Sequence, residues 1–506
     1  MLNRWNDDHA AQCRSELALR AYSSRLLGAD PALVLHGGGN TSLKAPGDEI
    51  LWVKGSGSDL AQVTEKDFTP LSIEPVRTLI QQKALNNEQM MAALAPCVRE
   101  PGRPKPSIET LLHAALPFRY VEHTHADAIL AVTNTRNGEA IARRIFGDLA
   151  PLVPFRHSGF DLAKTSFEVF REDRTPRTIG LILLQHGVFA FGDSAKAAYE
   201  NMLKLVGLAE AYLAEHQAWI LPRDDGPAQW SAREIALLRR DISLAAGFPM
   251  LACVRDDAQT LAFARRTGLA ELLQEGPATP QHAVFIKRMP MIGRDIASYS
   301  AAYLRYTGDA RGAPDSAPRV VLDAAFGALV LGFGPDYLQI TDDVFRHGRE
   351  IMTRASGHDI YRGLPAQAIL EAEIHYGGFE QRILTTKRHE DQLRGLCVGV
   401  ALGDDDVFSS PLIEALSGSA AAVVNLTQDA SADKLVSNFG GLDAIVAHPS
   451  QRAHIDALLP ILQCAPLGGT LLWLADRPST ILEGVRSIAV PRDVGRILNY
   501  LTYRTQ

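Results

Sequence analysis

The sequence has few cysteines, no long apolar run and no excess of basic residues. Its 506 residues include five cysteines, which lie far apart and form no CxxC pair. This usage argues against a thiolate metal site and suits a reducing compartment, so we expect a cytoplasmic protein. No run of about 18 apolar residues is present, so no membrane span is expected. A formal net charge of −7 argues against broad binding to nucleic acid or to anionic membranes.

The residues that are present predict an α/β protein in three parts. Residues 1–225 alternate apolar strand patterns with helical ones, and residues 1–28 and 73–95 within them look helical. Residues 226–390 are predicted to form a helix-rich extension, in which PRVVLD resembles a strand and FGALVLGFG reads as glycine-marked turns. Residues 395–506 alternate short apolar strands with helices, which is typical of a small parallel-sheet domain. No internal repeat is evident.

One helix is expected directly after a breaker-rich loop, REPGRPKPS. Ser107 has the chemistry of an N-cap residue, and the helix would run to about Phe118. This places Glu109 in the first turn. A carboxylate there could bind a metal, act as a general base or only favour the helix dipole.

Two histidines stand two positions apart in the segment EHTH, at the end of the strand pattern RYVEH. Alternate residues of a strand share a face, so His123 and His125 can bind one ion together. His186 is the best third ligand, because Gly187 follows it and apolar strand patterns flank it on both sides. The alternative for each histidine is an ordinary hydrogen-bonding role in the core or on the surface.

Two glycine-rich loops, HGGGNTS and KGSGS, offer backbone N–H groups and small hydroxyls that suit an anion such as phosphate. Lys54 could add a positive charge to such a site. Neither loop matches a nucleotide-binding fingerprint, so nucleotide binding is not indicated. Each loop taken alone could be a simple turn.

Taken together and in order, the motifs HGGGNTS, KGSGSDL, PSIETLLHAAL, EHTHADAI and LLQHGVFAFG resemble the class II aldolase/adducin family. The resemblance covers roughly residues 15–220. The middle region, with GPATPQH and PRVVL, is similar to longer relatives described as rhamnulose-1-phosphate aldolase/alcohol dehydrogenases. The resemblance as a whole implies a mixed, mostly antiparallel sheet flanked by helices and a small C-terminal Rossmann-like parallel-sheet domain. It also implies a homo-oligomer, which is a tetramer in many members of the family.

The resemblance also implies a set of site residues. A divalent metal, usually zinc but also manganese or cobalt, would be bound by His123, His125 and His186. Glu109 matches the catalytic carboxylate and can also touch the metal. Four further residues fall where the family binds the phosphate of its substrate, and they are Asn40, Ser56, Gly57 and Ser107. One departure is Gln185, which stands where asparagine is common, and it should not remove the ligand that follows it.

The function that the resemblance implies is a lyase of carbohydrate metabolism. A metal-dependent aldolase would cleave a small phosphorylated ketose through an enediolate, giving dihydroxyacetone phosphate and a short aldehyde. A pentulose-phosphate 4-epimerase or a decarboxylase on the same scaffold is one alternative. A non-catalytic, adducin-like interaction module is the other, although such modules lose the metal histidines that this chain keeps.

The C-terminal part looks like a shortened dehydrogenase domain. Its first strand, GLCVGVAL, leads into Gly403 and three aspartates, Asp404 to Asp406, where a glycine-rich turn would hold a pyrophosphate. Three carboxylates would repel that group, and no Tyr-x-x-x-Lys pair is present. We therefore expect no NAD binding here and a structural or assembly role instead.

Overall fold

The structure is a computed structural model, and its chain forms two compact units. One unit comprises residues 1–221, 278–281 and 347–368, and the other comprises 222–277, 282–346 and 369–506. Within the described residues, no helix is both long enough and apolar enough to cross a bilayer. The structure describes residues 1–45, 47, 49–308, 315–374, 393–402, 406–419, 421–426, 431–475 and 485–502.

A seven-stranded sheet with the order β3-β2-β1-β4-β7-β6-β5 is the centre of the first unit. Its neighbouring strands are antiparallel, except for β5 and β6, which are parallel. The mixed, mostly antiparallel sheet predicted from the sequence is confirmed. Its strands are β1 (Asn40–Lys44), β2 (Ile50–Lys54), β3 (Phe68–Ser72), β4 (Tyr120–Thr124), β5 (Leu152–Val153), β6 (Gly180–Leu183) and β7 (Gly187–Gly192).

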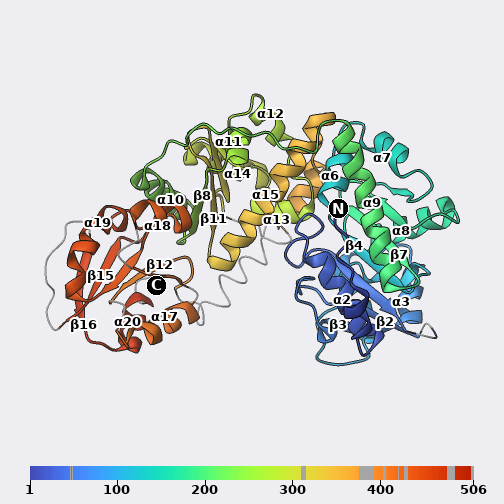
Figure 1. The fold of residues 1–506 in the computed structure, drawn as a ribbon, viewed down its shortest axis with the longest axis horizontal. Helices are drawn as coiled ribbons and strands as arrows, with labels where there is room; N and C mark the ends of the chain where they lie inside the picture. The colour runs from blue at the N-terminus through green and yellow to red at the C-terminus, as the bar shows by residue number, and fades with distance from the viewer. Residues whose placement is uncertain are drawn as a thin grey trace. The chain divides into compact units, whose positions relative to one another are not determined.

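Helices cover both faces of this sheet, and the side chains of the strands alternate between the two resulting cores. In β7, Val188 and Ala190 pack with α6, α7 and α9, whereas Phe189 and Phe191 pack with α3, α4, α5 and α8. Figure 1 shows the long helix α9 lying along β7. The helices are α3 (Ile73–Leu79), α4 (Asn87–Leu94), α5 (Thr110–Ala115), α6 (Asp127–Thr133), α7 (Gly138–Phe146), α8 (Phe160–Asp173) and α9 (Ala195–Glu215).

Two expected long helices are each divided, because a capping residue begins a new helix within them. In the first 28 residues, α1 (Asp7–Ala11) is followed by α2 (Glu16–Gly28), and the side chain of Ser15 accepts a hydrogen bond from the backbone of Ala18. In residues 73–95, α3 and α4 are separated, and Asn86 caps the second helix.

The helix expected from Ser107 to Phe118 is shorter than predicted. It begins at Thr110, and Glu109, not Ser107, occupies its N-cap position. The Ser107 carbonyl accepts from the Thr110 backbone, which makes a turn ahead of the helix. The helix ends at Ala115 because the next residue precedes a proline, where helical backbone is disfavoured.

The region expected to be helix-rich also contains a sheet with the order β8-β11-β10-β9. The segment FGALVLGFG was predicted to form turns, but most of it is strand β11. Both of its faces are buried, and its two glycines, Gly327 and Gly332, stand at the ends of a continuous apolar run. The strands are β8 (Leu251–Arg255), β9 (Met291–Ile292), β10 (Val320–Asp323) and β11 (Gly327–Gly332). The helices are α10 (Ala232–Ala246), α11 (Ala258–Ala264), α12 (Leu269–Gln274), α13 (Pro280–Ile286), α14 (Ile296–Thr307) and α15 (Pro335–His358).

This four-stranded sheet repeats half of the first sheet, so the expectation of no internal repeat is wrong. In β4-β7-β6-β5 and in β8-β11-β10-β9, two antiparallel pairs are followed by one parallel pair. The registers also agree, because Leu183 pairs with Gly187 as Asp323 pairs with Gly327. The long helices α9 and α15 follow the two equivalent strands β7 and β11.

The repeated sheet does not repeat the histidines. Because Thr124 pairs with Val188 and Arg255 pairs with Ala328, the two registers make His123 equivalent to Val254 and His125 to Asp256. The residue before Gly327 is Phe326, where the first unit has His186. The two segments carry different residues at these positions, so the histidine motif gives no sign of the repeat.

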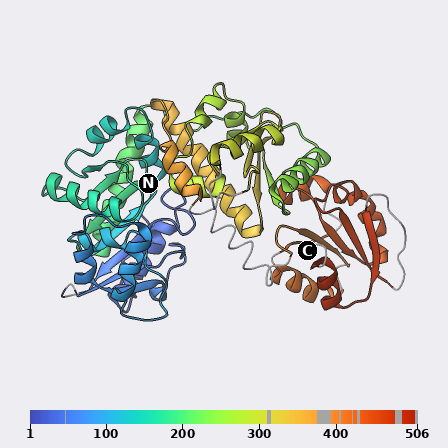
Figure 2. The same ribbon diagram turned by 180° about the vertical axis from the view of Figure 1, so that it is seen from behind.

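A parallel five-stranded sheet with the order β13-β12-β14-β15-β16 forms the C-terminal part, as predicted. This is one common doubly wound order, and it also equals the dinucleotide-binding order with its outermost strand removed. In Figures 1 and 2, α17 and α20 lie on one face of the sheet and α18 and α19 on the other. The elements are β12 (Cys397–Ala401), α17 (Ser409–Gly418), β13 (Ala422–Asn425), α18 (Ala432–Phe439), β14 (Ala444–Ala447), α19 (Arg452–Leu462), β15 (Gly469–Leu474), β16 (Val485–Val490) and α20 (Val494–Thr502).

The turn after β12, where three carboxylates were expected to repel a pyrophosphate, is described only in part. Residues 403–405 lie outside the described residues. Asp406 forms an ion pair with Arg492.

Candidate metal centre

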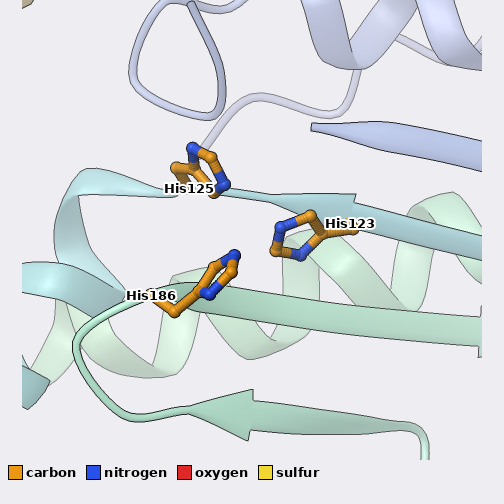
Figure 3. A group of neighbouring side chains, drawn as sticks. All are labelled: His123, His125 and His186. Atoms are coloured by element: carbon orange, nitrogen blue, oxygen red, sulfur yellow. The ribbon is translucent and has the colours of Figure 1, made fainter. Parts of the chain in front are cut away.

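Three histidines from two separate segments meet where β4 ends and β7 begins, at two central strands of the first sheet. His123 lies in β4, His125 follows the end of that strand, and His186 lies in the turn between β6 and β7 (Figure 3). One nitrogen atom from each ring lies within 4.8 Å of the other two. The sequence predicted this grouping, although their role as metal ligands stays a prediction.

The turn that presents His186 has an unusual backbone. Gln185 has a left-handed φ of 58°, and its side-chain amide donates to the carbonyl of Gly363 at 2.6 Å. Gly187 follows, and a Cβ at this position would lie 2.3 Å from the Thr124 carbonyl oxygen. Only glycine allows β7 to approach the end of β4 this closely, and this approach brings His186 beside His123.

The ring of His123 is fixed by its surroundings. It is fully buried and stacks on Phe189 with 4.4 Å between ring centroids. Its Nδ1 lies 3.1 Å from the Val188 carbonyl oxygen, which can only accept, so Nδ1 carries the proton. Nε2 is then a lone-pair donor, and it is buried without a hydrogen-bond partner.

His123 and His125 are held in the neutral form that binds metals. Burial lowers the pKa of His123 to about 3, against the opposing effect of Glu109. Burial, together with the nearby His186, lowers the pKa of His125 to about 4. Nδ1 of His186 is also buried without a hydrogen-bond partner. Three imidazoles with nitrogen atoms within 4.8 Å of one another, among them the buried and unpartnered Nε2 of His123, are a donor set that fits a divalent cation such as Zn²⁺.

Glu109 lies beside this group from the start of α5. Its carboxylate oxygens are 3.1 Å from Nε2 of His186 and 3.4 Å from Nε2 of His123. Burial alone would raise its pKa, but the two histidines and a hydrogen bond from Asn40 lower that pKa well below the ordinary value. Glu109 is therefore a carboxylate placed where it can contact either an ion or a substrate bound to it.

Asn40 connects the carboxylate to a buried polar chain. Its Nδ2 donates to Glu109 Oε2 at 2.7 Å, and its Oδ1 contacts Nε2 of His113. Nδ1 of His113 lies 2.7 Å from the hydroxyl of Ser42. Asn40 was predicted to contact the substrate phosphate, and its observed partner in this structure is Glu109. His113 supports the site through Asn40 and does not reach the three histidines' shared space.

The other predicted phosphate residues lie on neighbouring loops. Ser56 and Gly57 are exposed, and the backbone N–H of Ser56 donates to the Lys105 carbonyl. Ser107 is buried, and its hydroxyl accepts from the Glu109 backbone at 3.3 Å. A Cβ added to Gly37 would lie 3.9 Å from Gly57, so the two glycine loops are adjacent. These contacts place the loop of Ser56 and Gly57 beside the segment that leads into Ser107.

Lys54 lies under these loops. Its Nζ is 3.3 Å and 3.4 Å from the carbonyl oxygens of Gly37 and Gly39. Burial lowers its pKa to about 8, partly offset by nearby carboxylates including Glu109. It supplies the positive charge that was anticipated near the glycine loops.

One residue next to the centre was missed by sequence reasoning. Gln281, from the motif GPATPQH, has its Oε1 3.3 Å from Nδ1 of His125. It is 156 residues away along the chain, and glutamine carries no spacing pattern that would have linked it to a histidine motif.

Comparison with known proteins identifies the family of the chain. Residues 19–213 match the family described as "Class II Aldolase and Adducin N-terminal domain", and residues 229–384 match "Aldolase class II, second domain". The chain belongs to the class II aldolase and adducin family and carries both of these domains. The repeated half-sheet described above lies in the second of them.

A curated relative is the protein of Bacillus subtilis (strain 168) named "Uncharacterized oxidoreductase YuxG". It is 29% identical over 389 residues, which is 70% of this chain and 56% of the relative. This chain therefore spans little more than half the length of that relative.

Two solved structures are similar over the N-terminal part. The N-terminal class II aldolase domain of a conserved protein from Thermoplasma acidophilum is 35% identical, with a TM-score of 0.38, covering 42% of this chain and 99% of that one. The L-fuculose-1-phosphate aldolase from Thermus thermophilus is 18% identical, with a TM-score of 0.28, covering 41% of this chain and 97% of that one.

Proposed function

We propose that this protein is a metal-dependent aldolase that cleaves a small phosphorylated ketose into dihydroxyacetone phosphate and a short aldehyde. The observation that carries the proposal is the meeting of three histidines and one buried carboxylate at the end of β4. We assign His123, His125 and His186 as ligands of a divalent cation, which we propose to be Zn²⁺. Bound there, the ion would act as a Lewis acid for the negative charge that develops on the substrate oxygens.

Glu109 is the residue that we propose to move the proton. Retro-aldol cleavage turns a substrate hydroxyl into the aldehyde, releases its proton and leaves an enediolate. The Glu109 carboxylate would take up that proton and then deliver it to the enediolate carbon. Asn40 donates to one oxygen of Glu109, so the carboxylate is held in one orientation before substrate binds. Such fixed geometry lets binding energy be used for the reaction instead of for ordering the catalytic group.

The phosphate of the substrate is proposed to bind at the adjacent loops. The proposal is supported by the backbone bond from Ser56 to Lys105, two residues before Ser107, and by Lys54, which lies beside the first glycine loop. A phosphate held there, away from the bond that breaks, would orient the ketose toward Glu109.

The test is a screen of phosphorylated ketoses with the metal-loaded full chain, followed by a coupled assay for dihydroxyacetone phosphate. Glu109→Gln should keep the metal and lower turnover about 10²–10⁴-fold, which is typical for loss of a general acid or base. The control is Glu139→Gln, the same chemical change at an exposed position of α7, which should keep wild-type turnover.

Three results would contradict the proposal. Full activity of Glu109→Gln would remove its assigned role. Interconversion of pentulose phosphates without free aldehyde would show an epimerase instead. A chain that binds metal but acts on no phosphorylated ketose would support the non-catalytic alternative.

A further inference from the structure

The second class II aldolase domain contributes one side chain to the candidate metal centre. Gln281 lies at the start of α13, inside the sequence matched by that domain, yet residues 278–281 cluster with the first unit. Its amide contacts the ring of His125 on one side and the first glycine loop on the other.

The hydrogen bonds decide how the amide is oriented. Nε2 of Gln281 lies 3.0 Å from the Leu35 carbonyl oxygen and 3.3 Å from that of His36. Both carbonyls can only accept, so the nitrogen of the amide faces them. Oε1 then faces Nδ1 of His125 at 3.3 Å, and this ring nitrogen must carry the proton. The lone pair of His125 is therefore on Nε2.

The same amide also holds the glycine loop. The loop packs so closely that a Cβ on Gly38 would lie 3.1 Å from Oε1 and 3.2 Å from Nε2 of Gln281. Two residues later the chain enters β1 at Asn40, which donates to Glu109. The side chain of Gln281 therefore connects His125, a proposed metal ligand, to the loop that leads into Asn40.

We propose that Gln281 is a positioning residue of the metal centre. It fixes His125 in the tautomer that offers Nε2 to the ion, and it holds the loop of residues 35–39 against that histidine. The second domain is thereby a working part of the site, although its own repeated sheet has no histidines at the equivalent positions. This inference rests on the proposed metal site, but it does not depend on which reaction the site catalyses.

The experiment measures metal affinity of the full chain without substrate. Zn²⁺ is titrated in competition with a chromophoric chelator, and Co²⁺ is substituted to record its visible absorption, which reports ligand geometry. Gln281→Leu should weaken Zn²⁺ binding about 10–100-fold, the usual cost of losing a partner that orients a metal-bound histidine. The Co²⁺ spectrum should change as well.

A matched control separates positioning from general loosening. Asn134 donates to the carbonyl of Ala278 at 2.8 Å, so it anchors the same segment without touching His125. Asn134→Ala should lower thermal stability and leave Zn²⁺ affinity within about twofold of wild type. Unchanged affinity of Gln281→Leu would overturn the proposal, and so would an equal loss in Asn134→Ala.

A failure of the site itself would look different. His186→Ala should abolish stoichiometric Zn²⁺ binding, and if it does not, the metal site fails together with this inference. If His186→Ala loses the metal and Gln281→Leu weakens it, while no phosphorylated ketose is cleaved, the inference holds and only the proposed reaction is wrong.

Discussion

The substitution Gly187→Ala tests whether the close approach of β7 to β4 makes the metal centre. The added Cβ would lie 2.3 Å from the Thr124 carbonyl oxygen, whereas ordinary contact begins at 3.4 Å, so the strands must separate by about 1 Å. Metal–ligand distances tolerate only about 0.2 Å. His186 directly precedes this glycine, so we expect Zn²⁺ affinity to fall at least tenfold.

The repeated sheet supplies a control at the equivalent position. A Cβ on Gly327 would lie 2.4 Å from the Arg255 carbonyl oxygen, nearly the same clash. Overpacking of this kind costs typically 1–3 kcal/mol, so each variant should lower the melting temperature by several degrees. Only Gly187→Ala should lose Zn²⁺ affinity, because no histidine adjoins Gly327.

The assay is the chelator competition described above, combined with thermal unfolding of each variant. Wild-type Zn²⁺ affinity in a Gly187→Ala protein that is as destabilised as Gly327→Ala would refute the reasoning, because His186 would then not depend on the strand contact. A comparable loss of affinity in Gly327→Ala would also refute it, because the effect would be general.

Three further predictions follow from buried polar contacts in the first unit. Arg20→Met should lower the free energy of unfolding, measured by equilibrium denaturation, by about 3–5 kcal/mol, because it leaves the fully buried Glu122 without its ion-pair partner. The double variant Arg20→Met/Glu122→Leu should recover much of this loss. A double variant as unstable as the single one would disprove the explanation. Asn40→Ala should keep the metal and lower turnover about 10–100-fold, since it removes a hydrogen bond to the charged Glu109, and unchanged kcat would contradict this. The metal-free chain should lose stability as the pH falls below about 6.5. Burial lowers the pKa of His113 and His123 to about 3, so below about pH 6.5 the unfolded chain binds protons that the folded chain does not, and the free energy of unfolding falls by about 1.4 kcal/mol per pH unit for each histidine. Equal urea midpoints at pH 7 and pH 5 would contradict this prediction.

The parts of the fold that could be predicted from the sequence are those with local signals. The two apolar runs broken at Gln185, His186 and Gly187 predicted either two strands joined by a turn or one bent strand, and the structure has the antiparallel strands β6 and β7. The alternation of strands and helices after residue 395 predicted the parallel sheet. Both signals come from the periodicity of apolar residues, which can be read from the local sequence without knowing any distant contact.

What could not be predicted depended on distant contacts. The internal repeat shows in the hydrogen-bond registers of the two sheets, and Val254 and Phe326 stand at the positions equivalent to His123 and His186. Gln281 reaches His125 only because its segment returns to the first unit. Ser107 has the chemistry of a cap, but the turn at Thr110 and the proline after Leu116 set the helix ends.

The most direct test of the central claim is the zinc content of the purified full chain after loading with Zn²⁺ and removal of free ion. The wild-type chain should retain one ion, and the variants His123→Ala and His186→Ala should retain none. Absence of zinc from the wild-type chain, or the same content in the histidine variants, would contradict the assignment of these residues as a metal centre.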